Sequence, residues 1–151
     1  MSAKPVRPFA AGGDFRWEGV ELMRYKADGT APFKDVTRQV LFEDPSVAAQ
    51  LRYFEVSPGG YSTLERHEHA HAVLILRGCG QVLVGDAVHE VAQNDLVSIA
   101  SLAWHQFRPA PGESLGFLCM VNVERDKPQL PSDAEVAALR RNPAIAAFLA
   151  P

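Results

Sequence analysis

Short hydrophobic segments, rich in β-branched and aromatic residues, recur along the chain from Val20 onward. Turn-forming clusters separate them, among them Pro58-Gly59-Gly60, Gly78-Cys79-Gly80, Gly85-Asp86 and Asn94-Asp95. These clusters favour tight reversals, and connections this short predict antiparallel strands in a sandwich or barrel. The predicted strands are 20–25, 36–42, 51–56, 73–76, 81–84, 88–91, 96–99, 106–107 and 115–123.

The last part of the chain has a helical pattern instead. Ser132 and Glu135 stand at the spacing of a capping box, which predicts a short helix running to Arg141. Pro143 suits the first turn of a second helix, whose apolar side chains need a partner on the barrel. The pattern thus predicts an N-terminal arm (1–19), a β-barrel (20–127) and a C-terminal helical appendage (128–151).

Composition narrows the possible partners. The chain has 151 residues, 47% hydrophobic and 22% charged, which suits one globular domain with its own core. A formal net charge of −3 argues against nucleic acid as a partner, and the longest apolar run, residues 72–76, is too short to cross a membrane. The two cysteines, Cys79 and Cys119, are interpreted as packing residues, and a cytoplasmic location is expected.

Four of the five histidines are candidates for a metal site. His67, His69 and His71 alternate along one segment, His105 follows Trp104, and the fifth is interpreted as a solvated strand residue, His89. Imidazole is the commonest metal ligand in proteins. On a straight strand, residues two apart share a face, whereas residues four apart lie ~13 Å from each other. His67 and His71 therefore meet only if the chain bends, and local spacing does not choose between His69 and His71.

The stretch PGGYSTLERHEHAHAVLILRG (58–78) resembles the first motif of the cupin superfamily, G-x5-H-x-H-x3-E-x6-G. Gly59, His67 and Gly78 match the motif. Glu65 stands at the first histidine position of the motif, and His71 stands at its glutamate position. The histidine and the glutamate have thus changed places, and the motif keeps its imidazoles and one carboxylate. The resemblance therefore favours His71 over His69 as a ligand.

The second stretch, GDAVHEVAQNDLVSIASLAWHQF (85–107), is similar to the start of the second cupin motif, G-x5-P-x-G-x2-H-x3-N. His105 is the one identical residue of that motif. Asn94 replaces its first glycine, and asparagine tolerates a left-handed backbone better than most residues.

The resemblance implies an all-β cupin fold, a double-stranded β-helix or jelly-roll barrel, with short C-terminal helices. It also implies one divalent metal ion (Fe, Mn, Ni, Zn or Cu) held by His67, His71, His105 and Glu65. His69 is expected to support a ligand or to be the alternative ligand. For Glu65 the other interpretations are a hydrogen-bond acceptor for a ligand imidazole or an ion-pair partner of a nearby arginine, Arg66 or Arg77.

Such a site in a cupin implies a metal-dependent enzyme acting on a small organic molecule, with a dioxygenase-like oxidoreductase preferred and an isomerase or lyase as further options. An apolar pocket is expected around it, shaped by Phe54, Trp104, Phe107 or Phe117. The alternative is a non-catalytic ligand-binding or sensing cupin whose metal is structural or absent. The strands before residue 58 are expected to extend a sheet edge in a homodimer.

Overall fold

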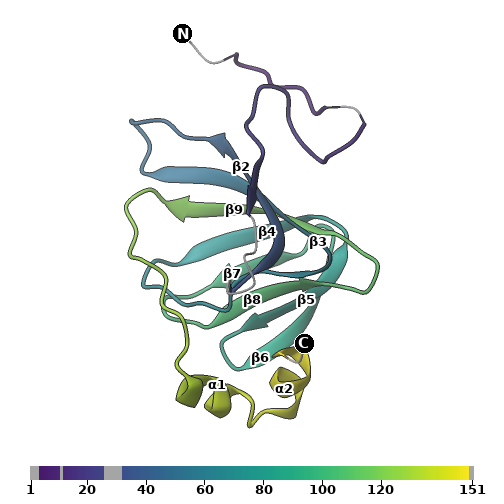
Figure 1. Cartoon of the computed structure of the whole chain (residues 1–151). Helices are drawn as coiled ribbons and strands as arrows, with labels where there is room; N and C mark the ends of the chain where they lie inside the picture. Colours follow the sequence, from purple (N-terminus) through teal and green to yellow (C-terminus); the bar gives the residue numbers. More distant parts are fainter. Residues whose placement is uncertain (1–3, 11, 26–31, 150–151) are drawn as a thin grey trace.

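The structure, a computed structural model, describes residues 4–10, 12–25 and 32–149 (Figure 1). The predicted arm, barrel and appendage each include a few residues outside these ranges, namely 1–3 and 11, 26–31, and 150–151. The division of the chain into these three parts stays a prediction.

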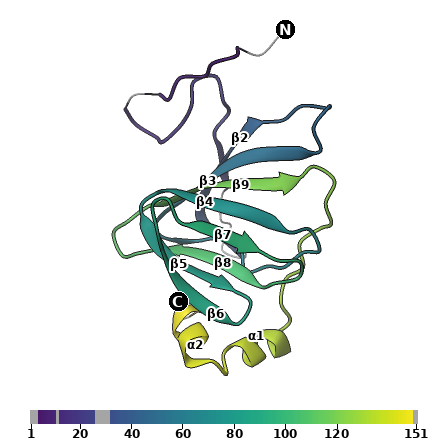
Figure 2. The same cartoon turned by 180° about the vertical axis from the view of Figure 1, so that it is seen from behind.

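Nine strands of the described chain form two antiparallel sheets, with sheet orders β1-β2-β3-β9-β4-β7 and β6-β5-β8 (Figures 1 and 2). All strand pairs are antiparallel, as predicted, but of the predicted short connections only Gly85-Asp86 joins two strands that pair with each other. The jelly-roll fold is confirmed as well. The strands are β1 (Met23–Tyr25), β2 (Lys34–Phe42), β3 (Ala49–Tyr61), β4 (His71–Arg77), β5 (Cys79–Val84), β6 (Ala87–Ala92), β7 (Leu96–Ile99), β8 (His105–Pro109) and β9 (Leu115–Asn122).

The core lies between the two sheets and follows the period-two alternation of the strands. In β9 the inward positions are Leu115, Phe117, Cys119 and Val121, all of which are buried. They pack against alternate residues of the neighbouring strands, such as Ile75 of β4. The apolar surface buried in this way is the main driving force for folding.

The reversal predicted at Pro58-Gly59-Gly60 is wrong, because β3 continues through these residues to Tyr61. Its pairing with β2 shifts between Val36↔Val56 and Lys34↔Tyr61, so that residues 57–60 lie opposite Asp35 alone. Gly59 has a φ of 78°, a conformation that glycine adopts without steric cost. The cluster therefore forms a bulge within a strand instead of a turn between strands.

Gly78 carries the chain from the larger sheet to the smaller one, between β4 and β5. Its φ is 74°, and a Cβ at this position would overlap the carbonyl oxygen of Ser114. The first motif therefore ends in glycine because the backbone has a positive φ there and leaves no room for a side chain.

The N-terminal segment covers the outer face of β2 and β3. The rings of Phe15 and Trp17 pack on the buried ring of Tyr53, with centroid distances of 5.2 and 5.3 Å. The buried Gln39 accepts a hydrogen bond from the amide of Trp17 and donates one to the carbonyl of Phe15. β1 then adds a strand to the sheet edge beside β2, as expected. The expected homodimer stays a prediction.

Both predicted helices are confirmed. Ser132 and Glu135 form the capping box of α1 (Asp133–Leu139), which ends with Arg140 as its C-cap, slightly earlier than predicted. α2 (Pro143–Leu149) begins at the predicted proline and lies against the smaller sheet (Figure 2). Ile145 and Phe148 on its apolar face pack against Leu83 of β5. No helix of the described chain has the length and apolar character needed to cross a membrane.

Candidate active site

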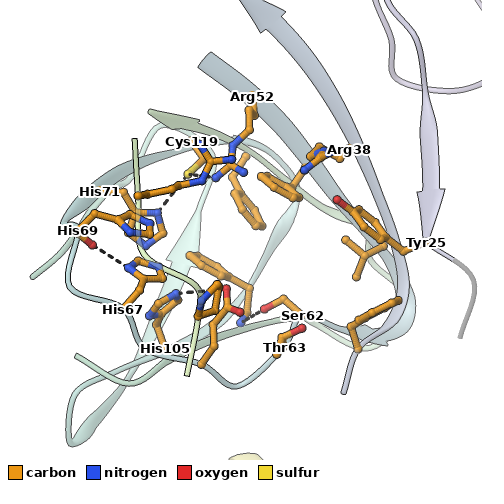
Figure 3. A pocket seen from close by; sticks show the side chains of 18 residues that line it. Tyr25, Arg38, Arg52, Ser62, Thr63, His67, His69, His71, His105 and Cys119 are labelled. Atoms are coloured by element: carbon orange, nitrogen blue, oxygen red, sulfur yellow. Dashed lines mark hydrogen bonds and ion pairs between the residues drawn. The ribbon is translucent and has the colours of Figure 1, made fainter. Parts of the chain in front are cut away.

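A cavity of about 260 Å³ opens between the two sheets, and histidine and arginine side chains are among the residues that line it (Figure 3). Histidines occupy one end of it in this view, and Tyr25 lies at the other. Of the aromatic residues expected to shape the pocket, Phe54, Phe107 and Phe117 line it. Trp104 is not among the lining residues, because its ring packs under the guanidinium of Arg66 at 4.4 Å.

Three of the predicted ligands converge within the cavity. One ring nitrogen from each of His67, His71 and His105 lies within 4.8 Å of the other two. Their ring centroids are 4.8 to 5.0 Å apart. This three-histidine group has the donor set and the spacing that suit one divalent ion.

Backbone pairing brings the two sequence motifs together. Glu65 and His105 exchange two backbone hydrogen bonds, of 3.2 and 3.0 Å, as an isolated antiparallel bridge. The amide of Leu102 donates to the carbonyl of His67 at 2.8 Å. The histidine of the second motif is thus fixed beside the first motif by main-chain contacts that do not depend on a metal.

The bend needed between His67 and His71 is present, at Glu68 and His69. No glycine or proline makes it. Asp126, from the segment after β9, accepts hydrogen bonds from the amides of both bend residues, at 2.8 and 3.2 Å, and bonds Nδ1 of His69 at 2.8 Å. These hydrogen bonds hold the pKa of Asp126 below its usual range, although partial desolvation opposes them. A carboxylate distant in sequence therefore stabilises the geometry of the three-histidine group.

Hydrogen bonds also orient the rings. Nδ1 of His67 faces the carbonyl of His69 at 2.7 Å, and Nδ1 of His105 faces that of Ala103 at 3.0 Å. A carbonyl only accepts, so both Nδ1 atoms carry the proton and both Nε2 atoms keep a free electron pair. Nε2 of His71 is buried and has no hydrogen-bond partner. A buried nitrogen without a hydrogen-bond partner destabilises the folded protein unless a ligand or a metal ion binds it.

The electrostatics keep the imidazoles neutral. Burial, together with the smaller effect of neighbouring imidazoles, lowers the pKa of His71 to about 3 and that of His105 to about 4, although the hydrogen bond to Ala103 opposes the shift at His105. Burial is also the main cause that lowers the pKa of His67. Neutral imidazole is the form that ligates metals.

The other candidate residues lie around this group. Glu65 faces the cavity, with a carboxylate oxygen 3.9 Å from Nε2 of His105, and burial raises its pKa to about 7. His69 stacks on His67 at 3.6 Å and pairs with Asp126, which is a supporting position. His89 is exposed on β6.

Cys119 lies beside the three-histidine group. Its sulfur is 3.1 Å from Nδ1 of His71, and Arg52 donates a hydrogen bond to it at 3.6 Å. Burial raises the pKa of the thiol, whereas the charge of Arg52 lowers it. Interpreting Cys119 as a packing residue is therefore incomplete, because it is buried but also lines the cavity. Cys79 is not among the residues that line it.

A jelly-roll barrel with histidines from two motifs converging in its interior defines the cupin class. A cupin domain model matches residues 52–121. The chain belongs to the cupin superfamily.

Several relatives within the superfamily are similar to this chain over almost its whole length. The 1-methylthio-D-xylulose 5-phosphate methylsulfurylase of Rhodospirillum rubrum is 59% identical over 146 residues, which cover 97% of this chain and 92% of that protein. A crystal structure of a cupin 2 conserved barrel domain protein from Rhodopseudomonas palustris has 56% identity and a TM-score of 0.90, covering 95% of this chain and 97% of that one. A cupin-2 domain structure from R. rubrum has 58% identity and a TM-score of 0.88, covering 97% of both chains.

One of these relatives corrects the expectation about the reaction. A dioxygenase-like reaction was preferred from the ligand set, but the relative at 59% identity is a methylsulfurylase and not a dioxygenase. The histidine ligand set is shared by many cupin chemistries, so it does not select a reaction.

Proposed function

We propose that His67, His71 and His105 hold one divalent metal ion, with Glu65 as the fourth protein ligand predicted from the sequence. The support is the fit of the side chains to such an ion. Two rings present an unprotonated Nε2 because their Nδ1 atoms donate to carbonyls, and the third presents a buried Nε2 without a partner. All three imidazoles are kept neutral by burial. Which of the divalent metals is bound is left open.

Replacing Asp126 with alanine is expected to weaken metal binding by about 10- to 100-fold, because it removes the three hydrogen bonds that hold the bend between His67 and His71. Competition with a coloured chelator measures the affinity. The matched control is Asp86→Ala, an exposed carboxylate in the β5–β6 turn. Equal metal affinity in the Asp126 variant and the control would show that the bend holds without this carboxylate.

We further propose that the protein is a methylsulfurylase that removes the methylthio group from 1-methylthio-D-xylulose 5-phosphate. The observation that carries this proposal is the thiol of Cys119 beside the three-histidine group, in a chain 59% identical to an enzyme of that name. The substrate carries a sulfur on C1, next to the C2 ketone. A nucleophile for the sulfur and a site for the carbonyl oxygen are therefore needed side by side.

A metal ion in this site would supply Lewis-acid stabilisation of negative charge on the ketone oxygen. The thiol of Cys119 releases its proton to solvent, and the resulting thiolate attacks the methylthio sulfur, forming an S–S bond as the S–C1 bond breaks. The electron pair of the broken bond passes to the sugar as an enolate, which takes a proton from solvent at C1. The products of this half-reaction are 1-deoxy-D-xylulose 5-phosphate and a methyl disulfide on Cys119.

A second thiol is needed to complete the cycle. A small-molecule thiol attacks the protein disulfide, takes the methylthio group as a mixed disulfide and returns the Cys119 thiol with its proton. His71 and Arg52 lie within hydrogen-bond distance of this sulfur, and both can donate to it when it is a thiolate. They therefore stabilise Cys119 both as attacking group and as leaving group.

Proton NMR of metal-loaded protein with 1-methylthio-D-xylulose 5-phosphate and dithiothreitol in D₂O tests this function. The S-methyl signal of the sugar is expected to disappear while a C1 methyl carrying one deuterium appears, because the enolate takes its proton from solvent. Substrate left at the level of a protein-free control would reject the methylsulfurylase. Metal binding without turnover would favour the ligand-binding or sensing cupin.

A further inference from the structure

Two arginines face into the barrel, where jelly-roll strands normally place apolar residues. Arg38 lies opposite Phe54 in the β2–β3 register, and Arg52 lies opposite Cys119 in the β3–β9 register. Paired residues point to the same face of a sheet. Phe54 and Cys119 both line the cavity, and so do the two arginines.

Neither inward arginine has a carboxylate partner within 4 Å in the described chain. Arg38 donates to the sulfur of Met23 and lies over the ring of Tyr25, while Arg52 donates to Cys119 and lies over Phe54. The Nε atoms of both arginines are buried without a hydrogen-bond partner. A partly buried cation with unsatisfied donors is costly, which indicates that the site is completed by an anion from outside the chain.

A third arginine stands near the first two. Arg125 lines the same cavity from the segment after β9, where it donates to the carbonyls of Asn122 and Val123. Burial lowers its pKa, and the charges of Arg52 and Arg38 lower it further, so the three guanidinium groups share one region of the cavity.

The charge of this region is opposite to that of the whole chain, which carries a formal −3. Two acidic residues interact electrostatically with these arginines: Glu43 with Arg125, and Glu65 with Arg52. Neither forms an ion pair with them in the described structure. The lining of the cavity thus combines three guanidinium groups with one carboxyl, that of Glu65, which forms no ion pair with them among the described residues.

We infer that Arg38, Arg52 and Arg125 form an anion subsite that binds the phosphate group of a small sugar phosphate. This inference rests on the proposed function for the sugar, but its evidence is the arginines themselves. Guanidinium groups bind phosphate oxygens with two parallel hydrogen bonds, and several converging on one phosphate give strong, oriented binding.

The subsite would also fix the orientation of the substrate in the cavity. In Figure 3 Arg52 lies next to Cys119 and the histidines, and Arg38 lies further along the same wall toward Tyr25. A phosphate held by the arginines therefore leaves the other end of a short sugar facing Cys119 and the three-histidine group. In a 1-methylthio ketose 5-phosphate that end carries the sulfur and the ketone.

Calorimetric titration of metal-loaded protein with D-xylulose 5-phosphate and with D-xylulose tests the subsite without turnover. The phosphate ester is expected to bind at least about 100-fold more tightly, because several charge-assisted hydrogen bonds are lost with the phosphate. Arg38→Met is the main variant, since Arg38 contacts neither Cys119 nor a histidine. It should weaken binding of the phosphate ester about 10-fold or more and leave D-xylulose binding and metal content unchanged.

Arg141→Met is the matched control, because Arg141 is exposed beyond α1 and is not among the residues that line the cavity. Methionine preserves the apolar stem of arginine, and circular dichroism with thermal melting checks that each variant folds. Equal affinity for the two sugars, or an Arg38 variant that behaves like the control, would overturn the subsite. Turnover without phosphate selectivity would overturn the subsite alone, whereas phosphate selectivity without turnover would reject only the proposed methylsulfurylase.

Discussion

Replacing Cys119 with serine is expected to reduce turnover of 1-methylthio-D-xylulose 5-phosphate by at least about 1,000-fold, because a serine hydroxyl is a poor nucleophile toward divalent sulfur. Serine is nearly isosteric with cysteine, and its hydroxyl can still meet His71 and Arg52. Metal content and folding should therefore stay as in the wild type. Steady-state kinetics and elemental analysis on the same preparations separate these effects.

Cys79 provides the matched control for this experiment. It is a free cysteine like Cys119, but it is only partly buried and does not line the cavity. Cys79→Ser should keep wild-type turnover. Mass spectrometry of wild-type protein, quenched after reaction without added thiol, should show one methylthio group on Cys119. Full activity in the Cys119 variant would eliminate the covalent step and leave the metal site as the remaining source of catalysis.

Removing one imidazole from the three-histidine group should have a comparably large effect on the metal. Untagged wild-type protein is expected to contain close to one divalent ion per chain, and His71→Ala is expected to weaken metal binding more than about 100-fold and to abolish turnover. His71 is the informative position because its buried Nε2 has no other partner. Elemental analysis after dialysis against a defined metal buffer gives the occupancy.

Two further histidine variants make this result specific. His89→Ala changes an exposed imidazole on β6 and should keep full metal content. His69→Ala should weaken binding less than His71→Ala, because the ring of His69 pairs with Asp126 and stacks on His67 instead of joining the group. If His69→Ala loses the metal and His71→Ala retains it, the assignment of ligands is reversed.

Local patterns predicted most of the secondary structure, for reasons that are themselves local. Alternation of apolar residues marks a strand with one buried face, and a capping box closes the first turn of a helix, whatever the rest of the chain does. The exception at Pro58-Gly59-Gly60 has the same basis. Glycine permits both a turn and a bulge, and only the pairing of β3 with β2 decides between them.

The arginines of the proposed subsite carry a signal in the sequence. Arg38 shares its strand face with Val36, and Arg52 shares its face with Phe54 and Val56, all of them inward positions. A cation at an inward position of an otherwise amphipathic strand is unusual. Cys119 gave no such signal, because a cysteine among alternating apolar residues has the pattern of a core residue.

Local patterns and spaced motifs were sufficient to predict most of the strands, both helices, the family and the cluster of histidines, because each depends on residues close together in the chain or at a fixed spacing. Spacing left His69 and His71 as alternatives and the cupin resemblance favoured His71. The tertiary structure places His71 with His67 and His105 and shows which residues surround them. The bend between His67 and His71 depends on Asp126, which lies 57 and 58 residues away from its bonding partners. Cys119 reaches His71 across 48 residues, through the pairing of β9 with β4. Contacts over such separations are set by strand register, which no local pattern encodes.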